Sequence, residues 1–130
     1  MEEFVVMNTH FESIFAFVRI KFIDIILEKQ QEFCDIPFVL IGDFNTLPSS
    51  SVYKKLADNF YDAQDLVDDA SFFDFYTFHD FVEDVRNMRL DYIFLSKNDF
   101  KVNEYKVMNN NYDGAYSSDH FPVLINAKII

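Results

Sequence analysis

The sequence is poor in cysteine and in positive charge. Its one cysteine, Cys34, excludes an intramolecular disulfide framework and fits a reducing, cytoplasmic setting. We expect this cysteine to be packed in the interior. Lys and Arg number 11 against 22 Asp and Glu, which gives a net charge of −11. Because sequence-independent DNA binding depends on basic residues that neutralise phosphates, this balance argues against a grip on nucleic acid by this chain alone.

Long apolar runs are also missing. No stretch approaches the roughly 20 apolar residues needed to cross a bilayer, and the first residues do not resemble a signal peptide, so no membrane span is expected. What the chain does have is apolar and aromatic, since half of its 130 residues are hydrophobic and 17 are Phe. That content can bury a core, and it excludes an intrinsically disordered chain. The length suits one domain, residues 1–130.

Apolar periodicity predicts alternating strands and helices. Residues 12–33 carry apolar side chains at helical spacing, and the serines at 49–51 are placed to cap a second helix that runs to about Leu56. The predicted strands are 4–7, 38–41, 75–78, 90–95, 102–108 and 121–130. The acidic stretch 61–74 is predicted to be a solvated loop. This order of strands and helices predicts an α/β fold.

Four short polar segments stand beside these apolar runs. In chain order they are Asn8-Thr9-His10, Gly42-Asp43-Phe44-Asn45, Arg89-Leu90-Asp91-Tyr92 and Ser118-Asp119-His120. Each follows or opens a predicted strand, so each is expected at the rim of the core. Side chains at such a rim are available for function, because the scaffold beneath them is rigid.

These segments contain the groups that hydrolysis of a phosphoester requires. Asp119 offers a carboxylate to a hard cation, next to the imidazole of His120, the side-chain type that exchanges protons near neutral pH. Asp91 could hold that imidazole in one tautomer, and Asp43 could orient the attacking water or bind metal. The two residues placed to donate to phosphoryl oxygens are Asn45 and His10. Taken singly, an Asp-His pair is more often part of a turn or a capped strand end than of a catalytic site.

Taken together, the four segments resemble the later motifs of the endonuclease/exonuclease/phosphatase (DNase I-like) family. Their order and spacing match over essentially the whole chain, and the most specific segments are 42–45 and 118–123. The resemblance implies a four-layer α/β sandwich, of which this chain would form the C-terminal half, with a mixed, mainly antiparallel sheet and flanking helices. It also implies cleavage of a phosphoester by water with Mg²⁺ or Mn²⁺ as the cofactor.

The same resemblance implies a role for each residue of the site. His120 would be the general base or acid, and Asp91 its orienting partner. Asp43 would position the nucleophilic water and, together with Asp119, bind the metal. The residues that would contact the scissile phosphate are His10 and Asn45.

The chain is about half as long as members of that family, and the N-terminal half is absent. That half supplies an early Asn and the principal metal-binding Glu, so we expect weak metal binding and weak or no activity from this chain alone. The inner face of the sheet and one edge strand would be uncovered. Three explanations stay open: a fragment of a longer protein, a chain that pairs with another chain supplying the missing half, or a homologue that has lost its function.

The sequence allows one main alternative function, and it does not identify the substrate. The alternative to a metal-dependent phosphoesterase is a non-catalytic module that binds a partner or a phosphorylated ligand on the same scaffold. The substrate classes are a small molecule, a lipid head group or nucleic acid, and the acidic composition favours the first two. We expect Arg89 to order the loop near Asp91 through a salt bridge. His79 and Asp80 either reach the rim of the cleft or belong to a plain loop.

Overall fold

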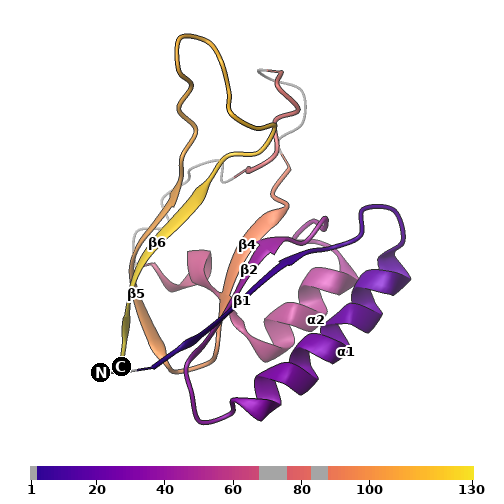
Figure 1. Ribbon diagram of the computed structural model, residues 1–130, viewed down its shortest axis with the longest axis vertical. Helices are drawn as coiled ribbons and strands as arrows, with labels where there is room; N and C mark the ends of the chain where they lie inside the picture. The colour runs from indigo at the N-terminus through magenta and orange to yellow at the C-terminus, as the bar shows by residue number, and fades with distance from the viewer. Residues whose placement is uncertain (1–2, 68–75, 83–87) are drawn as a thin grey trace.

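The computed structural model describes residues 3–67, 76–82 and 88–130. Within these ranges strands and helices alternate along most of the chain as the sequence predicts, which confirms the α/β class (Figure 1). The elements are β1 Val5–His10, α1 Ala16–Glu32, β2 Phe38–Asp43, α2 Ser51–Asn59, β3 Tyr61–Asp62, the 3-10 helix η1 Ala63–Leu66, β4 Asp91–Leu95, β5 Phe100–Val107 and β6 Val123–Ile129.

The main sheet is mixed and has the strand order β1-β2-β4-β3. β1 runs parallel to β2, so the carboxyl ends of both strands meet at one edge, where His10 lies opposite Asp43. β4 is antiparallel to β2 and therefore begins at that same edge, with Asp91 opposite Asp43. The pairing thus brings three polar residues from distant parts of the sequence to one end of the sheet.

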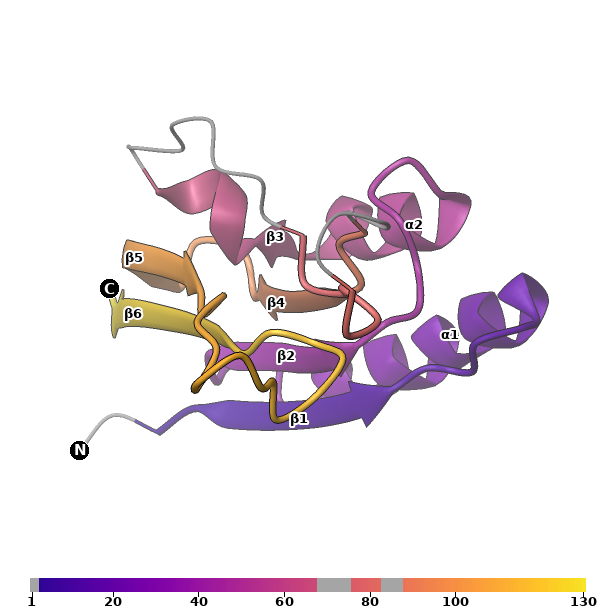
Figure 2. The ribbon, with the colours of Figure 1, turned by 90° about the horizontal axis from the view of Figure 1, so that it is seen from above.

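One face of this sheet packs against both helices, and Figures 1 and 2 show α1 and α2 side by side on that face. Alternate strand residues point toward the helices, because successive side chains of a strand face opposite sides. The core between these layers holds buried side chains from α1, β2, α2 and β4, among them Ile23, Phe38, Leu40, Leu56 and Phe94. Packing against the two helices therefore holds in place the sheet that carries the three polar residues at its edge.

The opposite face of the sheet is covered only in part. β5 and β6 form a separate antiparallel pair that packs, together with η1, against β4 (Figure 2). Their shared cluster includes Ile93, Leu95, Val102 and Tyr105. Both strands were predicted from the sequence, with bounds that differ by one or two residues. The chain therefore has the layers of half an α/β sandwich.

Two predicted boundaries at the first strand and helix are wrong. The segment Asn8-Thr9-His10 was expected in a loop, but it continues β1, because the ladder with β2 extends to the end of both strands. The first helix begins at Ala16 rather than at residue 12. The carboxylate of Glu12 accepts hydrogen bonds from the backbone N–H groups of Ile14 and Phe15, which forms a turn just before the helix.

The prediction of a solvated loop at 61–74 is wrong for its first part. Tyr61–Asp62 pairs with β4, and the side chain of Asp62 is buried beneath it. Residues 68–74 lie outside the described residues. The predicted strand 75–78 is partly outside them as well, and Phe78 makes only isolated bridges, to Met88 and His120.

Two smaller expectations concern the cap of the second helix and the cysteine. Ser50 accepts a hydrogen bond from the backbone N–H of Tyr53, so a serine caps α2 as predicted, although the helix continues to Asn59. Cys34 is exposed rather than packed, because it follows the end of α1 on the surface. In the described part of the chain, no helix has the length and apolar character needed to cross a membrane.

Candidate active site

Three side chains meet at the polar edge of the main sheet. His120 Nδ1 lies 2.6 Å from Asp91 Oδ2, and His120 Nε2 lies 3.8 Å from Asp43 Oδ2. Their potential ligand atoms all fall within 4.8 Å of one another. Asp43 ends β2 and Asp91 begins β4, so both carboxylates stand on rigid strands. The structure therefore brings together His120, Asp91 and Asp43, three of the residues that the sequence singled out.

The environment of Asp43 disfavours its charged form. Burial raises the pKa of Asp43 above its ordinary range, and the nearby charge of Asp91 adds to that effect. A backbone hydrogen bond from Asn45 to Asp43 Oδ1, at 2.8 Å, works in the opposite direction. Two carboxylates in one partly buried cluster are stabilised by a cation, since a positive charge lowers the pKa of both groups.

His10 and Asn45 flank Asp43 on two sides. His10 Nε2 lies 3.4 Å from Asp43 Oδ2, and its side chain is 75% exposed, so the imidazole is accessible to a ligand. Asn45 adopts a left-handed conformation with φ 46°, and its amide Nδ2 donates to the carbonyl of Phe11 at 2.7 Å. That bond fixes the orientation of the amide and uses one of its two N–H groups.

Asp119 stands apart from this cluster. It precedes His120 in the sequence, but its carboxylate is not among the three groups that could share a metal ion within the described residues. Its Oδ1 accepts a hydrogen bond from the hydroxyl of Ser118 at 3.3 Å. Asp43 and Asp119, the two expected metal ligands, therefore do not converge on one point in this structure.

Two residues that the sequence interpretation did not assign contribute to the site. The hydroxyl of Thr77, which is fully buried, accepts hydrogen bonds from the backbone N–H groups of Leu90 and Asp91, both at 3.0 Å. It thereby holds the start of β4. Asn8 shares a face of β1 with His10. Both residues line a cleft of about 480 Å³, which Asp43 and Asp91 also line. The two-residue period of a strand could have indicated Asn8, whereas the role of Thr77 depends on backbone contacts that its residue type does not reveal.

Close packing between β1 and β2 sets the position of His10 relative to Asp43. Gly42 has φ +143°, and a Cβ added there would lie 1.7 Å from the carbonyl oxygen of Thr9. Only glycine permits that approach, because it lacks a side chain and tolerates positive φ. Gly42 thus lets the two strands carry their terminal residues to the same point.

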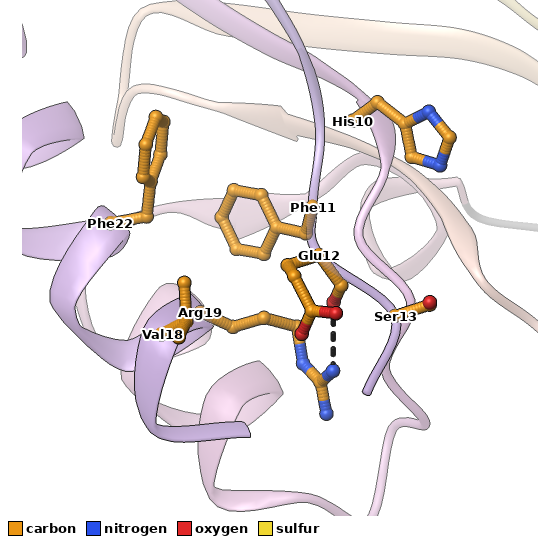
Figure 3. Close-up of a pocket in the computed structure, with 7 residues that line it drawn as sticks. All are labelled: His10, Phe11, Glu12, Ser13, Val18, Arg19 and Phe22. Atoms are coloured by element: carbon orange, nitrogen blue, oxygen red, sulfur yellow. Dashed lines mark hydrogen bonds between the residues drawn. The ribbon is translucent and has the colours of Figure 1, made fainter. Parts of the chain in front are cut away.

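A second pocket, of about 470 Å³, opens on the other side of His10, between β1 and α1 (Figure 3). Figure 3 shows His10 and Phe11 pointing to opposite sides of the chain, as alternation along an extended segment requires. The rings of Phe11 and Phe22 lie 6.0 Å apart along one wall. Arg19 crosses the floor and donates to the carbonyl of Glu12 at 2.8 Å, so it orders the turn before α1.

The donors at the sheet edge fit a hard divalent cation. Mg²⁺ and Mn²⁺ prefer oxygen ligands and retain several waters, so a few carboxylates suffice to hold them. Asp43 and Asp91 provide such oxygens at one end of the sheet. His120 contacts Asp91 through Nδ1, so Nε2 is the ring nitrogen that faces Asp43.

The chain thus combines a mixed sheet, helices on one of its faces and a carboxylate-imidazole cluster at its edge. The sequence matches the model of the endonuclease/exonuclease/phosphatase family over residues 15–120. This chain belongs to that family, as its motifs predicted. No curated protein matches the sequence significantly.

Solved structures extend this likeness to the fold. A functionally unknown conserved protein of Enterococcus faecalis is 25% identical, with a TM-score of 0.84 over 98% of this chain and 50% of its own. A mannosyl-6-phosphatase of Bacteroides thetaiotaomicron is 26% identical, with a TM-score of 0.83 over 98% and 52%. The catalytic domain of human Nocturnin, 23% identical, has a TM-score of 0.73 over 99% and 48% and shares the fold. The chain spans about half the length of these relatives.

Proposed function

We propose that this chain carries catalytic residues of a metal-dependent phosphoester hydrolase. The proposal rests on two contacts of the His120 imidazole. Asp91 holds the ring through Nδ1, and Asp43 faces Nε2 on its other side. Family membership supports the reaction class. A similar structure is that of a mannosyl-6-phosphatase, which acts on a phosphate ester.

His120 is the proposed general base, with Asp91 as its orienting partner. The 2.6 Å contact with Asp91 places the imidazole proton on Nδ1, which leaves Nε2 free to accept a proton. Nε2 faces Asp43 Oδ2 at 3.8 Å, so a water molecule beside both groups is oriented by Asp43 and loses its proton to Nε2. In the second half of the reaction the same nitrogen can return a proton to the leaving group.

His10 and Asn45 are the proposed donors to the phosphoryl oxygens. The exposed imidazole of His10 lies against Asp43, at the mouth of the cleft, and can turn toward a bound phosphate. The amide of Asn45 has a second N–H group beyond the one that Phe11 uses. Donors aimed at developing negative charge lower the barrier most when the scaffold holds them in place.

Mg²⁺ or Mn²⁺ is the proposed cofactor, with Asp43 and Asp119 as the proposed ligands. Asp43 already lies in the cluster, whereas Asp119 is next to His120 in the sequence and must turn inward to join it. When bound, the cation would neutralise charge on the phosphoryl oxygens. The acidic composition of the chain favours a small molecule or a lipid head group as the substrate over nucleic acid.

The site also needs the half of the fold that this chain does not span. An apolar groove of about 610 Å³ lies on the face of the sheet away from the helices, between β1 and the β5–β6 pair. Phe4 and Val6 point into it and are 54% and 51% exposed. The relatives are about twice as long as this chain, so the proposed occupant is the missing N-terminal half, whose carboxylate would complete the metal site.

If the N-terminal half of the fold occupies this groove, Val6→Lys should affect the isolated chain and a completed domain differently. The completed domain, used below, joins the N-terminal half of the Bacteroides mannosyl-6-phosphatase to residues 3–130 of this chain. Val6→Lys should reduce self-association of the isolated chain, because it places a charge on an exposed apolar face. In the completed domain it should lower the free energy of unfolding by about 1.5–3 kcal/mol, because the position is then buried.

Analytical ultracentrifugation of the isolated chain and thermal unfolding of the completed domain measure these two effects. Phe17→Lys is the matched control, since Phe17 is 68% exposed on α1 and should change neither quantity. A stable dimer of the isolated chain that Val6→Lys dissociates, together with an unchanged completed domain, would show that the occupant is a second copy of the chain.

The metal dependence of the reaction is the test of the proposed function. The completed domain should release phosphate from hexose 6-phosphate or p-nitrophenyl phosphate in Mg²⁺ or Mn²⁺, and EDTA should abolish that release. The isolated chain should be weakly active or inactive, because it lacks the carboxylate ligand that the N-terminal half would add to the metal site. A folded completed domain that hydrolyses neither ester with any divalent metal would support the non-catalytic module instead.

A further inference from the structure

A tight turn beside the catalytic imidazole has an unusual residue at its centre. The backbone N–H of Val82 donates to the carbonyl of His79 at 3.0 Å, which closes a four-residue turn. Its central residues, Asp80 and Phe81, have φ 54° and 57°. These are the two positive φ angles of a type I′ turn, which Gly, Asn and Asp adopt most readily. Asp80 fits that preference, whereas a bulky residue such as Phe81 is strained there.

Packing does not compensate this strain. The side chain of Phe81 is 60% exposed, and its ring contacts that of His79 only edge-on, with 6.0 Å between centroids. Glycine at this position would remove the strain and lose little buried area. Backbone strain that persists without a structural benefit is found mainly at functional sites, where surrounding contacts hold it in place.

The residues around the turn tie it to the catalytic cluster. The backbone N–H of His79 donates to the carbonyl of Asp119 at 2.9 Å, and Phe78 pairs with His120 in an isolated bridge. The rings of Phe78 and His120 are in edge contact at 5.0 Å. Thr77, four residues before Phe81, holds the backbone of Asp91. The turn is therefore anchored to two of the three residues of the site.

His79 makes the base of the turn rigid. It is buried, and its ring stacks on that of Phe121 at 4.2 Å between centroids. Among the residues that the structure describes, neither ring nitrogen has a hydrogen-bond partner, which is an unfavourable state for a buried polar group. The chain thus maintains two unfavourable features, at His79 and at Phe81, within one turn next to His120.

We propose that Phe81 and Asp80 bind the leaving group of the phosphoester and select one that carries a ring with hydroxyl groups. The exposed ring of Phe81 offers a flat apolar surface to one face of a sugar or nucleoside. The exposed carboxylate of Asp80 accepts hydrogen bonds from hydroxyl groups beside it. This inference rests on the proposed function, because it assigns the leaving-group side of that same site.

The test compares Phe81→Gly with the wild-type completed domain on three phosphate esters. They are a hexose 6-phosphate, a nucleoside 5′-monophosphate and glycerol 2-phosphate, which has hydroxyl groups but no ring. Phe81→Gly should raise KM about tenfold for at least one ring-bearing ester, the factor that corresponds to 1.4 kcal/mol. It should leave kcat and the KM for glycerol 2-phosphate unchanged. Whichever ring-bearing ester shows the effect identifies the sugar or the nucleoside as the source.

Thermal unfolding separates a binding role from a structural one. Phe81→Gly should keep or raise the melting temperature, because glycine adopts positive φ without strain. Phe17→Ala, which removes another exposed ring, should change no kinetic constant. A lower melting temperature, or an equal loss on all three esters, would overturn the assignment of Phe81 while leaving the hydrolase in place. Absence of hydrolysis by the wild-type domain would instead contradict the proposed function.

Discussion

Replacing His120 with alanine should lower kcat for metal-dependent hydrolysis by the completed domain about 100- to 10,000-fold. The substitution removes the imidazole that Asp91 holds at 2.6 Å and that faces Asp43 at 3.8 Å. No other imidazole among the described residues contacts both carboxylates. KM should change little, because the lost interaction acts on the attacking water rather than on the bound ester.

Steady-state kinetics in saturating Mg²⁺ measure this loss. Lys101→Ala is the control, since Lys101 is an exposed residue of β5 outside the site. Asp91→Asn should be impaired as well, because an amide no longer stabilises the imidazolium that forms when Nε2 takes up a proton. A His120→Ala variant that retains more than half of the wild-type kcat would remove His120 from the reaction.

Replacing Asp62 with alanine should lower the free energy of unfolding by about 3–5 kcal/mol. The Asp62 side chain is 1% exposed and accepts hydrogen bonds from Arg89 Nη2 at 2.7 Å and from the Tyr53 hydroxyl at 2.9 Å. Burial lowers the pKa of Arg89, but the ion pair with Asp62 raises it by more, so the guanidinium stays charged. Without Asp62 the charged guanidinium of Arg89 stays buried and no longer has a carboxylate partner.

Urea unfolding of the completed domain measures this effect, and a surface ion pair supplies the control. Asp58 pairs with Lys54 at 3.0 Å on the exposed face of α2, and Asp58→Ala should cost less than about 1 kcal/mol. Equal losses from the two substitutions would mean that burial of the Asp62–Arg89 pair contributes nothing. Since Arg89 lies two residues before Asp91, Asp62→Ala should also reduce hydrolysis.

The sequence predicted the α/β class because apolar periodicity is a local property. Strands with a clear apolar pattern, such as β4 and β6, lie within two residues of where the pattern places them. The stretch that begins at Tyr61 was predicted to be a solvated loop because it is rich in acidic residues. The reason Asp62 is buried is its pairing with Arg89, 27 residues further along the chain. A local pattern cannot show such a partner.

The site was predictable to a similar extent. Asp43, Asp91 and His120 meet as the motifs indicated, because parallel β1 and β2 and antiparallel β4 share one edge. The role of Thr77 could not be predicted, because its hydroxyl acts on backbone N–H groups that only the folded chain brings to it. The strain at Phe81 depends on a backbone angle, and residue type does not reveal it.

Hydrolysis in water enriched in ¹⁸O by the completed domain tests the central claim most directly, because the claim is that this chain activates water to attack phosphorus. Mass spectrometry of the released phosphate should show one ¹⁸O atom per phosphate in Mg²⁺, with no release in EDTA or from the His120→Ala variant. Phosphate without the label, or label in the released alcohol instead, would contradict the roles assigned to Asp43, Asp91 and His120.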